Sequence, residues 1–68
     1  MSQIWEKNNL KRYREEKGLT QKELAELLKV TQPAIQKWEK GSREPNLQNV
    51  IDICKVLDIT VEQLLNTK

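Results

Sequence analysis

Apolar residues recur at intervals of three and four positions along most of this chain, with polar and charged residues between them. That spacing is typical of amphipathic α-helices, each with one buried stripe. Aromatic and β-branched residues never alternate with polar ones over a strand-length run, and no internal repeat or low-complexity stretch is visible. The pattern therefore predicts an all-α chain, in which start and stop signals define five helices.

The first predicted helix ends near Lys17, where Gly18 supplies the left-handed residue that commonly closes a helix. Its start remains open, because either Ser2 or the pair Asn8 and Asn9 could cap it. The sequence thus allows a long or a short first helix.

The second and third predicted helices have clear start signals. Thr20-Gln21-Lys22-Glu23 is a capping box, in which Thr20 accepts from the Glu23 amide while Glu23 reaches back to Thr20. Thr31 caps the third helix, which has Pro33 in its first turn and ends at Gly41. The expected buried residues are Leu24, Ala25, Leu27 and Leu28 in the second helix, and Ala34, Ile35 and Trp38 in the third.

The last two predicted helices are also marked by their caps. Asn46, just after Pro45, caps the fourth helix, and Thr60-Val61-Glu62-Gln63 is a second capping box that opens the fifth. The apolar stripe of the fourth helix is expected to consist of Leu47, Val50, Ile51, Cys54 and Leu57. Cys54 is therefore interpreted as a buried, inert thiol.

Length and composition restrict the function. With 68 residues, 37% of them hydrophobic and 32% charged, the chain is expected to form one small globular domain over residues 1–68. No apolar run of about eighteen residues and no signal-peptide pattern is present, which favours a cytoplasmic protein. One cysteine and no histidine exclude a disulfide frame, a zinc site built on Cys and His, and a His-dependent triad. We therefore expect no metal or other cofactor, and an enzyme fits least well.

The placement of charge is more informative than the net charge of +2. At about 100° per residue, the third predicted helix turns a face without acids away from its apolar side. In the major groove, glutamine can pair with adenine, and lysine with guanine or phosphate. The competing interpretation is a solvated polar face, which this composition alone favours. The residues of this face are Gln32, Pro33, Gln36, Lys37 and Lys40.

The connection between the second and third predicted helices consists of Lys29, Val30 and Thr31. So short a connection is expected of a helix-turn-helix, although short helical hairpins are common. Spacing alone therefore leaves both interpretations open.

The order of segments adds a family resemblance. LKRYREEKGLTQKELAELL, TQPAIQKWEKG, a loop with Pro45, and LQNVIDICKVLDITVEQLL follow one another over Leu10–Leu65. In this order they resemble the Cro/C1-type (XRE family) helix-turn-helix proteins. The resemblance implies a compact five-helix, lambda-repressor-like fold with the helix-turn-helix at about residues 21–40. The third helix would then lie in the major groove of duplex DNA, with the second across the backbone.

The same resemblance implies roles for individual residues. Residues at the family's base-facing positions are Gln32, Pro33, Gln36 and Lys37, and residues at its backbone-contacting positions are Gln21, Lys40, Ser42 and Arg43. Arg14 and Glu39 match a structural ion pair, for which a partly buried pair is preferred over an exposed one.

Two positions depart from the family pattern. Lys29 stands where the turn usually has glycine, so a residue with a side chain is expected to adopt a left-handed conformation at a cost of about 1 kcal/mol. Pro33 stands where relatives often offer a polar side chain, which leaves apolar contact, for example with a thymine methyl group, as its means of base interaction.

The resulting hypothesis is a sequence-specific transcriptional regulator, specifically a repressor that binds a two-fold operator as a homodimer. Candidate dimer contacts are Val61, Leu64 and Leu65, with Leu64 the weakest because it can pack internally. The alternative is an antitoxin or other interaction module with an unidentified protein partner. Trp5 and Ile4 either cover the core or form a partner contact, and both roles stay open.

Overall fold

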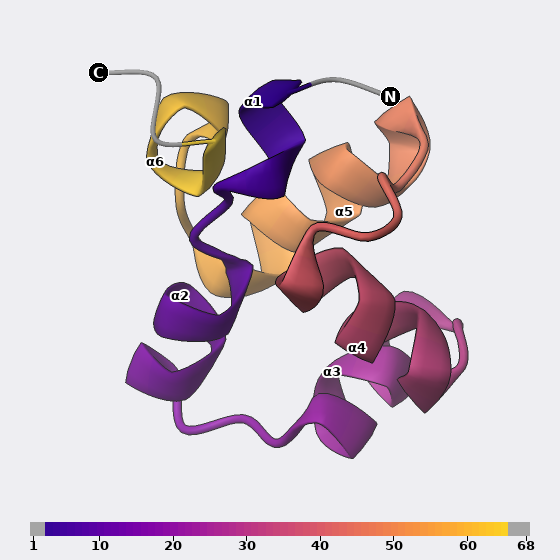
Figure 1. Cartoon of the computed structure of the whole chain (residues 1–68). Coiled ribbons are helices and arrows are strands. Elements are labelled where there is room, and N and C mark those ends of the chain that lie inside the picture. The colour runs from indigo at the N-terminus through magenta and orange to yellow at the C-terminus, as the bar shows by residue number, and fades with distance from the viewer. Residues whose placement is uncertain (1–2, 66–68) are drawn as a thin grey trace.

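The computed structural model describes residues 3–65, with side chains from residue 5 onward. Six helices follow one another in this part of the chain, and no strand occurs there (Figure 1). The all-α prediction is therefore confirmed. The five predicted helices correspond to α2–α6, and a short α1 precedes them. The helices are α1 (Gln3–Glu6), α2 (Leu10–Glu16), α3 (Gln21–Leu28), α4 (Gln32–Lys40), α5 (Leu47–Leu57) and α6 (Val61–Leu65).

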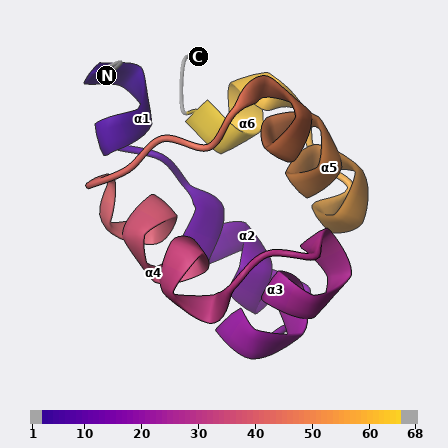
Figure 2. The same ribbon diagram turned by 90° about the vertical axis from the view of Figure 1, so that its right-hand side faces the viewer.

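The helices surround one shared core. α4 packs against α2 and α3, and α5 packs against α3 and α6. Figure 2 shows α4 and α5 on opposite sides of the molecule, with α1 and α6 at the end away from α3. Every helix contributes at least one buried apolar side chain, so the fold depends on all of them. The buried apolar residues are Trp5, Leu10, Leu24, Ala25, Leu28, Ile35, Trp38, Ile53, Leu57 and Leu64.

The hydrogen bonds of Asn8 show where the first predicted helix begins. Its side-chain oxygen accepts from the Leu10 amide at 2.9 Å, and α2 starts at that residue. Its side-chain nitrogen donates to the carbonyls of Trp5 and Trp38, at 2.8 and 2.9 Å. Of the two alternatives for the first predicted helix, the short helix that begins after Asn8 and Asn9 is therefore confirmed. Ser2, the other candidate cap, lies outside the described residues.

α1 is part of the core rather than a partner surface. Trp5 is 1% exposed, so it covers the core and is not available for a partner contact. The side chain of Ile4, for which the same two roles were open, lies outside the described side chains. The end of α1 also lies directly against the end of α4. A Cβ built on Gly41 would lie 2.7 Å from the carbonyl oxygen of Glu6, so only glycine fits there.

The predicted helix caps are present. Both hydrogen bonds of the Thr20/Glu23 capping box form, at 3.0 and 2.8 Å, and so do both bonds of the Thr60/Gln63 box. Thr31 and Asn46 accept from the amides of Ala34 and Asn49. These caps depend on residues close together in sequence, which is why the sequence predicts them well.

The predicted stripe of α5 was wrong in part. Leu47 is 76% exposed and Ile51 is 37% exposed, whereas Ile53, which was not predicted, is fully buried. α5 carries apolar residues on more than one face, so its periodicity does not specify which face meets α3 and α6. In α3, Leu27 is likewise 56% exposed rather than buried. Cys54 is partly buried, and burial raises the pKa of its thiol, which keeps the thiol protonated at neutral pH.

The turn between α3 and α4 contains the expected strained residue. Lys29 ends α3 with φ 59° and ψ 42°, a left-handed conformation that favours glycine. The Val30 amide then donates to the Ala25 carbonyl at 2.9 Å, which closes the end of α3. This tight turn brings the start of α4 against α3.

Candidate nucleic-acid interface

The outer face of α4 projects from one side of the molecule. Ile35 is fully buried and Trp38 is 4% exposed, so these two side chains anchor the inner face of α4 in the core. The residues predicted to contact DNA on the opposite face are all exposed. They are Gln32, Pro33, Gln36, Lys37 and Lys40, and this face contains no acid.

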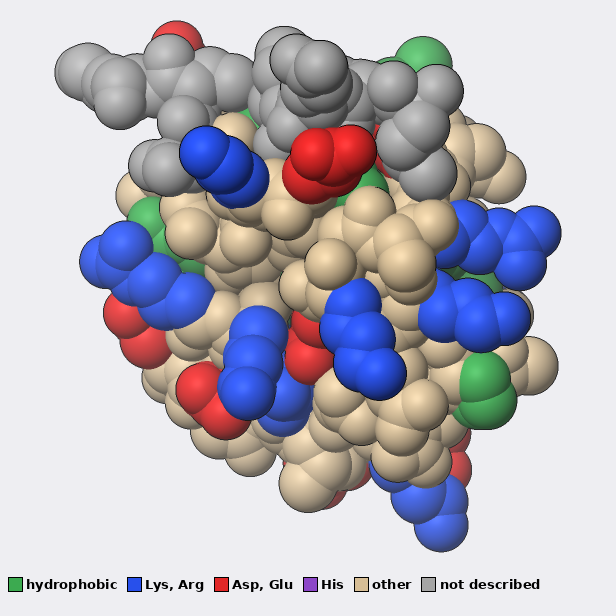
Figure 3. Space-filling model, viewed as in Figure 1, with side chains coloured by type: hydrophobic (Ala, Val, Ile, Leu, Met, Phe, Trp, Pro, Cys, Tyr) green, Lys and Arg blue, Asp and Glu red, His purple; other side chains and the backbone are tan. Residues whose placement is uncertain are grey.

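Basic side chains extend this surface beyond α4. Figure 3 shows Lys and Arg side chains spread over the face that carries α2 and α4, the same face that Figure 1 presents. Arg43 is exposed in the loop after α4 and borders a hollow of about 290 Å³ together with Trp38 and Pro45. Acidic side chains lie between the basic ones on this face (Figure 3), so it is the exposed cations of α4 and the following loop, rather than the whole face, that suit a polyanion.

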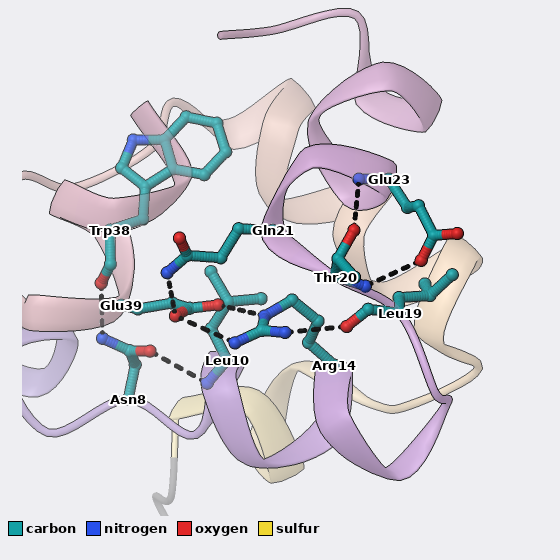
Figure 4. Close-up of polar contacts among 9 residues, drawn as sticks. All are labelled: Asn8, Leu10, Arg14, Leu19, Thr20, Gln21, Glu23, Trp38 and Glu39. Carbon is teal, nitrogen blue, oxygen red and sulfur yellow. Dashed lines mark hydrogen bonds and ion pairs between the residues drawn. The ribbon is translucent and has the colours of Figure 1, made fainter. Parts of the chain in front are cut away.

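A buried ion pair holds α4 in place (Figure 4). The side chains of Arg14 and Glu39 are only 9% and 5% exposed. The Arg14 Nε donates to one carboxylate oxygen of Glu39, and its Nη2 donates to the other at 3.4 Å. The Arg14 Nη1 donates to the carbonyl of Leu19 at 2.7 Å. One guanidinium thus ties α2 to α4 and to the loop before α3.

Gln21 joins the same network. Its Nε2 donates to the Glu39 Oε1 at 2.9 Å, so the carboxylate positions the amide at the first residue of α3. Gln21 is half-buried. Its side-chain amide has two hydrogens, and the bond to Glu39 uses only one of them. The sequence indicated a role for Gln21 at the DNA backbone but not this hydrogen bond between α3 and α4.

Gln21 also borders a hollow that the sequence did not predict. The hollow has a volume of about 400 Å³ and lies between α2, α3 and α4. Its lining includes Lys11 of α2, a residue that the sequence reasoning did not single out. Lys11 lies three positions before Arg14, so both point to the same side of α2, and this spacing was the available signal. The lining residues are Lys11, Gln21, Gln36, Glu39 and Lys40.

Ser42 is engaged within the chain. Its hydroxyl donates to the carbonyl of Lys37 at 3.3 Å, and its amide donates to the same carbonyl at 3.1 Å. Phosphate oxygens only accept hydrogen bonds, so Ser42 has no hydrogen to offer in this arrangement. Within residues 5–65, the side chains of Lys40 and Arg43 take part in no hydrogen bond or ion pair.

The candidate dimer contacts differ in accessibility. Leu64 is fully buried in the core, so its assignment as a dimer contact was wrong. Its place at the staple position after the Thr60 cap points it inward. Val61 is 46% exposed, and Leu65 is partly buried against the core.

Residues 3–65 contain no group of three or more His, Cys, Asp or Glu side chains that could hold a metal ion. No helix in this range is long and apolar enough to cross a membrane.

Comparison with known proteins shows the family to which this chain is similar. A family described as helix-turn-helix matches residues 10–64. The chain is 38% identical over 58 residues to the HTH-type transcriptional regulator MJ0272 of Methanocaldococcus jannaschii, covering 85% of this chain and 88% of that protein.

Two other relatives are longer than this chain. It is 44% identical over 57 residues to the HTH-type transcriptional regulator YqaE of Bacillus subtilis and 42% identical over 57 residues to the transcriptional activator BcrR of Enterococcus faecalis. Each alignment covers 84% of this chain, but only 49% of YqaE and 28% of BcrR. The chain therefore spans about half the length of YqaE and just over a quarter of BcrR.

A solved structure has a similar fold. The clp gene regulator ClgR of C. glutamicum matches with a TM-score of 0.81 and 26% identity, over 97% of this chain and 88% of that one.

The buried ion pair leads to a prediction about stability. Arg14→Met leaves the Glu39 carboxylate buried without its partner, and we expect the free energy of unfolding to fall by about 3 to 5 kcal/mol. Urea unfolding followed by tryptophan fluorescence measures this. Arg12→Met is the control, because the Arg12–Glu16 pair is 64% and 57% exposed and is worth less than about 1 kcal/mol.

The double variant Arg14→Met with Glu39→Met keeps this test informative if the single variant does not fold. With no charge left unpaired, it is expected to regain part of the lost stability. A double variant no more stable than Arg14→Met alone would contradict the proposed cause.

Proposed function

The chain belongs to the Cro/C1-type helix-turn-helix family, and on this premise we propose that it is a transcriptional regulator that binds duplex DNA through α4. The observation that carries the proposal is the outer face of α4, which exposes glutamine and lysine and no acid while Ile35 and Trp38 hold the helix in the core. The relatives described above support it by their names, since YqaE and MJ0272 are named as uncharacterized HTH-type transcriptional regulators and BcrR as an HTH-type transcriptional activator.

α4 has the shape and chemistry to read bases. The major groove, about 12 Å wide, admits one α-helix. Gln32, Gln36 and Lys37 lie on the exposed face in the first two turns of α4, where recognition helices make their base contacts. Glutamine suits adenine and lysine suits guanine. Pro33 can offer only apolar contact to a thymine methyl group, so we propose four base-facing residues with different roles.

The neighbouring residues suit the DNA backbone. We propose that Lys40 and Arg43 contact phosphates, because both are exposed cations beside the base-facing surface. Gln21 would add its remaining amide hydrogen, positioned by Glu39. Ser42 would join them only after its hydroxyl leaves the Lys37 carbonyl, since that bond uses its hydrogen.

We further propose that two copies bind one operator. A single recognition helix reads a few base pairs, too few to find one site among about 10⁶ or more competitors in a genome. α6 lies at the end of the molecule away from α3 and beside α5, so it leaves the outer face of α4 free (Figure 2). Its exposed Val61 is the leading contact, with the accessible part of Leu65 beside it. Half-sites would then be about 34 Å apart.

Repression is the proposed direction of control. A bound dimer can block a promoter by occupying it, whereas activation requires an additional favourable contact with the transcription machinery. The relative BcrR is named an activator, so the direction needs its own test.

The base-reading role is tested with duplexes selected from a random library. Gln36→Ala is expected to weaken binding to the selected site far more than to random duplex, because it removes a base contact. Arg43→Ala is expected to weaken both equally and to lower the salt slope by about 0.9. Fluorescence anisotropy measures both effects, and Gln48→Ala, an exposed glutamine on α5, is the control. Equal losses for Gln36→Ala on both duplexes would reject base reading.

The dimer is tested by sedimentation on the selected duplex. The wild-type chain is expected to reach two copies per duplex, and Val61→Glu only one, because it places a charge in the proposed contact. Leu27→Glu, at a similarly exposed leucine on α3, should still reach two. One wild-type copy per duplex would contradict the dimer, and two copies of Val61→Glu would exclude Val61 as the contact.

The direction of control is tested with a reporter behind a promoter that contains the selected site. We expect expression to rise several-fold when the chain is absent, and Gln36→Ala to behave like its absence. Lower expression without the chain would identify an activator.

A further inference from the structure

The hollow between α2, α3 and α4 is lined mainly by polar and basic side chains. Lys11, Gln21 and Lys40 reach it from three different helices, and Gln36 of the outer face of α4 borders it as well. The remaining lining residue is Glu39. Hydrogen-bond donors and two cations therefore converge on a space of about 400 Å³.

Glu39, the acid in the lining, does not prevent an anion from binding in the hollow. The Glu39 side chain is 5% exposed, and its oxygens accept from Arg14 and Gln21. Arg14 balances its charge. What the hollow presents to solvent is therefore the positive charge of Lys11 and Lys40, together with the amide groups of Gln21 and Gln36.

The amide of Gln21 is oriented for a donor role. Because one of its hydrogens is held by Glu39 at 2.9 Å, the rotation of the amide is restricted. The second hydrogen has no partner in this network, and less side-chain entropy is lost when it bonds to a ligand.

The position of the hollow favours a DNA phosphate over a free ion. Gln36 belongs both to the hollow and to the surface proposed to face bases, so a duplex lying along α4 passes over the hollow.

We propose that this hollow holds one phosphate of the DNA backbone, and that Lys11 of α2 is a phosphate-contacting residue together with Lys40 and Gln21. The proposal rests on the DNA binding proposed above and adds α2 to the helices that touch DNA. The duplex would then be held from three helices that the Arg14–Glu39 network already locks together. Lys11 thus helps to fix how α4 enters the groove.

Lys11→Gln tests the proposal on ordinary mixed-sequence duplex. Losing one phosphate contact lowers the salt slope by about 0.9, so the decrease in affinity between about 50 and 200 mM salt should become about threefold to fourfold smaller. Lys55→Gln is the matched control, because Lys55 is exposed on α5, which contributes no residue to the lining of the hollow, and the change in net charge is the same. Its salt slope should stay close to that of the wild type. Circular dichroism verifies that both variants fold, as expected for exposed positions.

A second experiment locates the phosphate. Single neutral methylphosphonate linkages are placed one at a time along the selected duplex. One position should weaken the wild-type chain more than it weakens Lys11→Gln, which keeps only the Lys40 and Gln21 contacts to that phosphate, while Lys55→Gln behaves as the wild type does.

The outcomes separate the two proposals. If the wild-type chain binds duplex but Lys11→Gln keeps the wild-type salt slope, the role of Lys11 is overturned and DNA binding by α4 stands. If no linkage distinguishes Lys11→Gln from the wild type, the single-phosphate site is overturned. A wild-type chain that binds no duplex at all overturns both proposals.

Discussion

The buried pair of Arg14 and Glu39 is the interaction on which the rest of the structure depends. α4 has nine residues, too few to be stable as a helix by itself, so its position must come from its neighbours. Apolar contacts of Ile35 and Trp38 hold its inner face but tolerate small shifts along the core. The guanidinium of Arg14 removes that freedom, because its bonds to Glu39 and Leu19 have fixed directions. The exposed side chains of α4 are therefore presented in one orientation.

Local chemistry made much of the fold predictable. Thr20, Thr31, Asn46 and Thr60 cap their helices through bonds that span three residues, and Lys29 adopts the left-handed turn that its position requires. The outer face of α4 follows from the same logic, since a helix with one strongly apolar side shows its other side to solvent. α1 was missed, because four residues give too short a pattern.

Features that depend on distant residues were not predictable in this way. α5 has apolar residues on several faces, and only its packing against α3 and α6 decides that Ile53 is buried and Leu47 is not. The sequence indicates only that Asn8 can cap a helix, but its side chain also donates a hydrogen bond to the carbonyl of Trp38, thirty positions away. The hollow beside Gln21 requires three helices to meet, so the spacing of Lys11 and Arg14 within α2 does not by itself indicate that Lys11 belongs to the hollow.

The contact between Gly41 and Glu6 shows that residues before α2 belong to the folded domain. The family match begins at residue 10, yet the backbone of Glu6 leaves no space for a Cβ at position 41, and Trp5 is part of the core. The unit that folds here is thus larger than the span that the family model matches. A fragment of this chain that began at residue 10 would expose the end of α4 beside Gly41. A chimera that transplants this recognition helix needs the preceding residues as well.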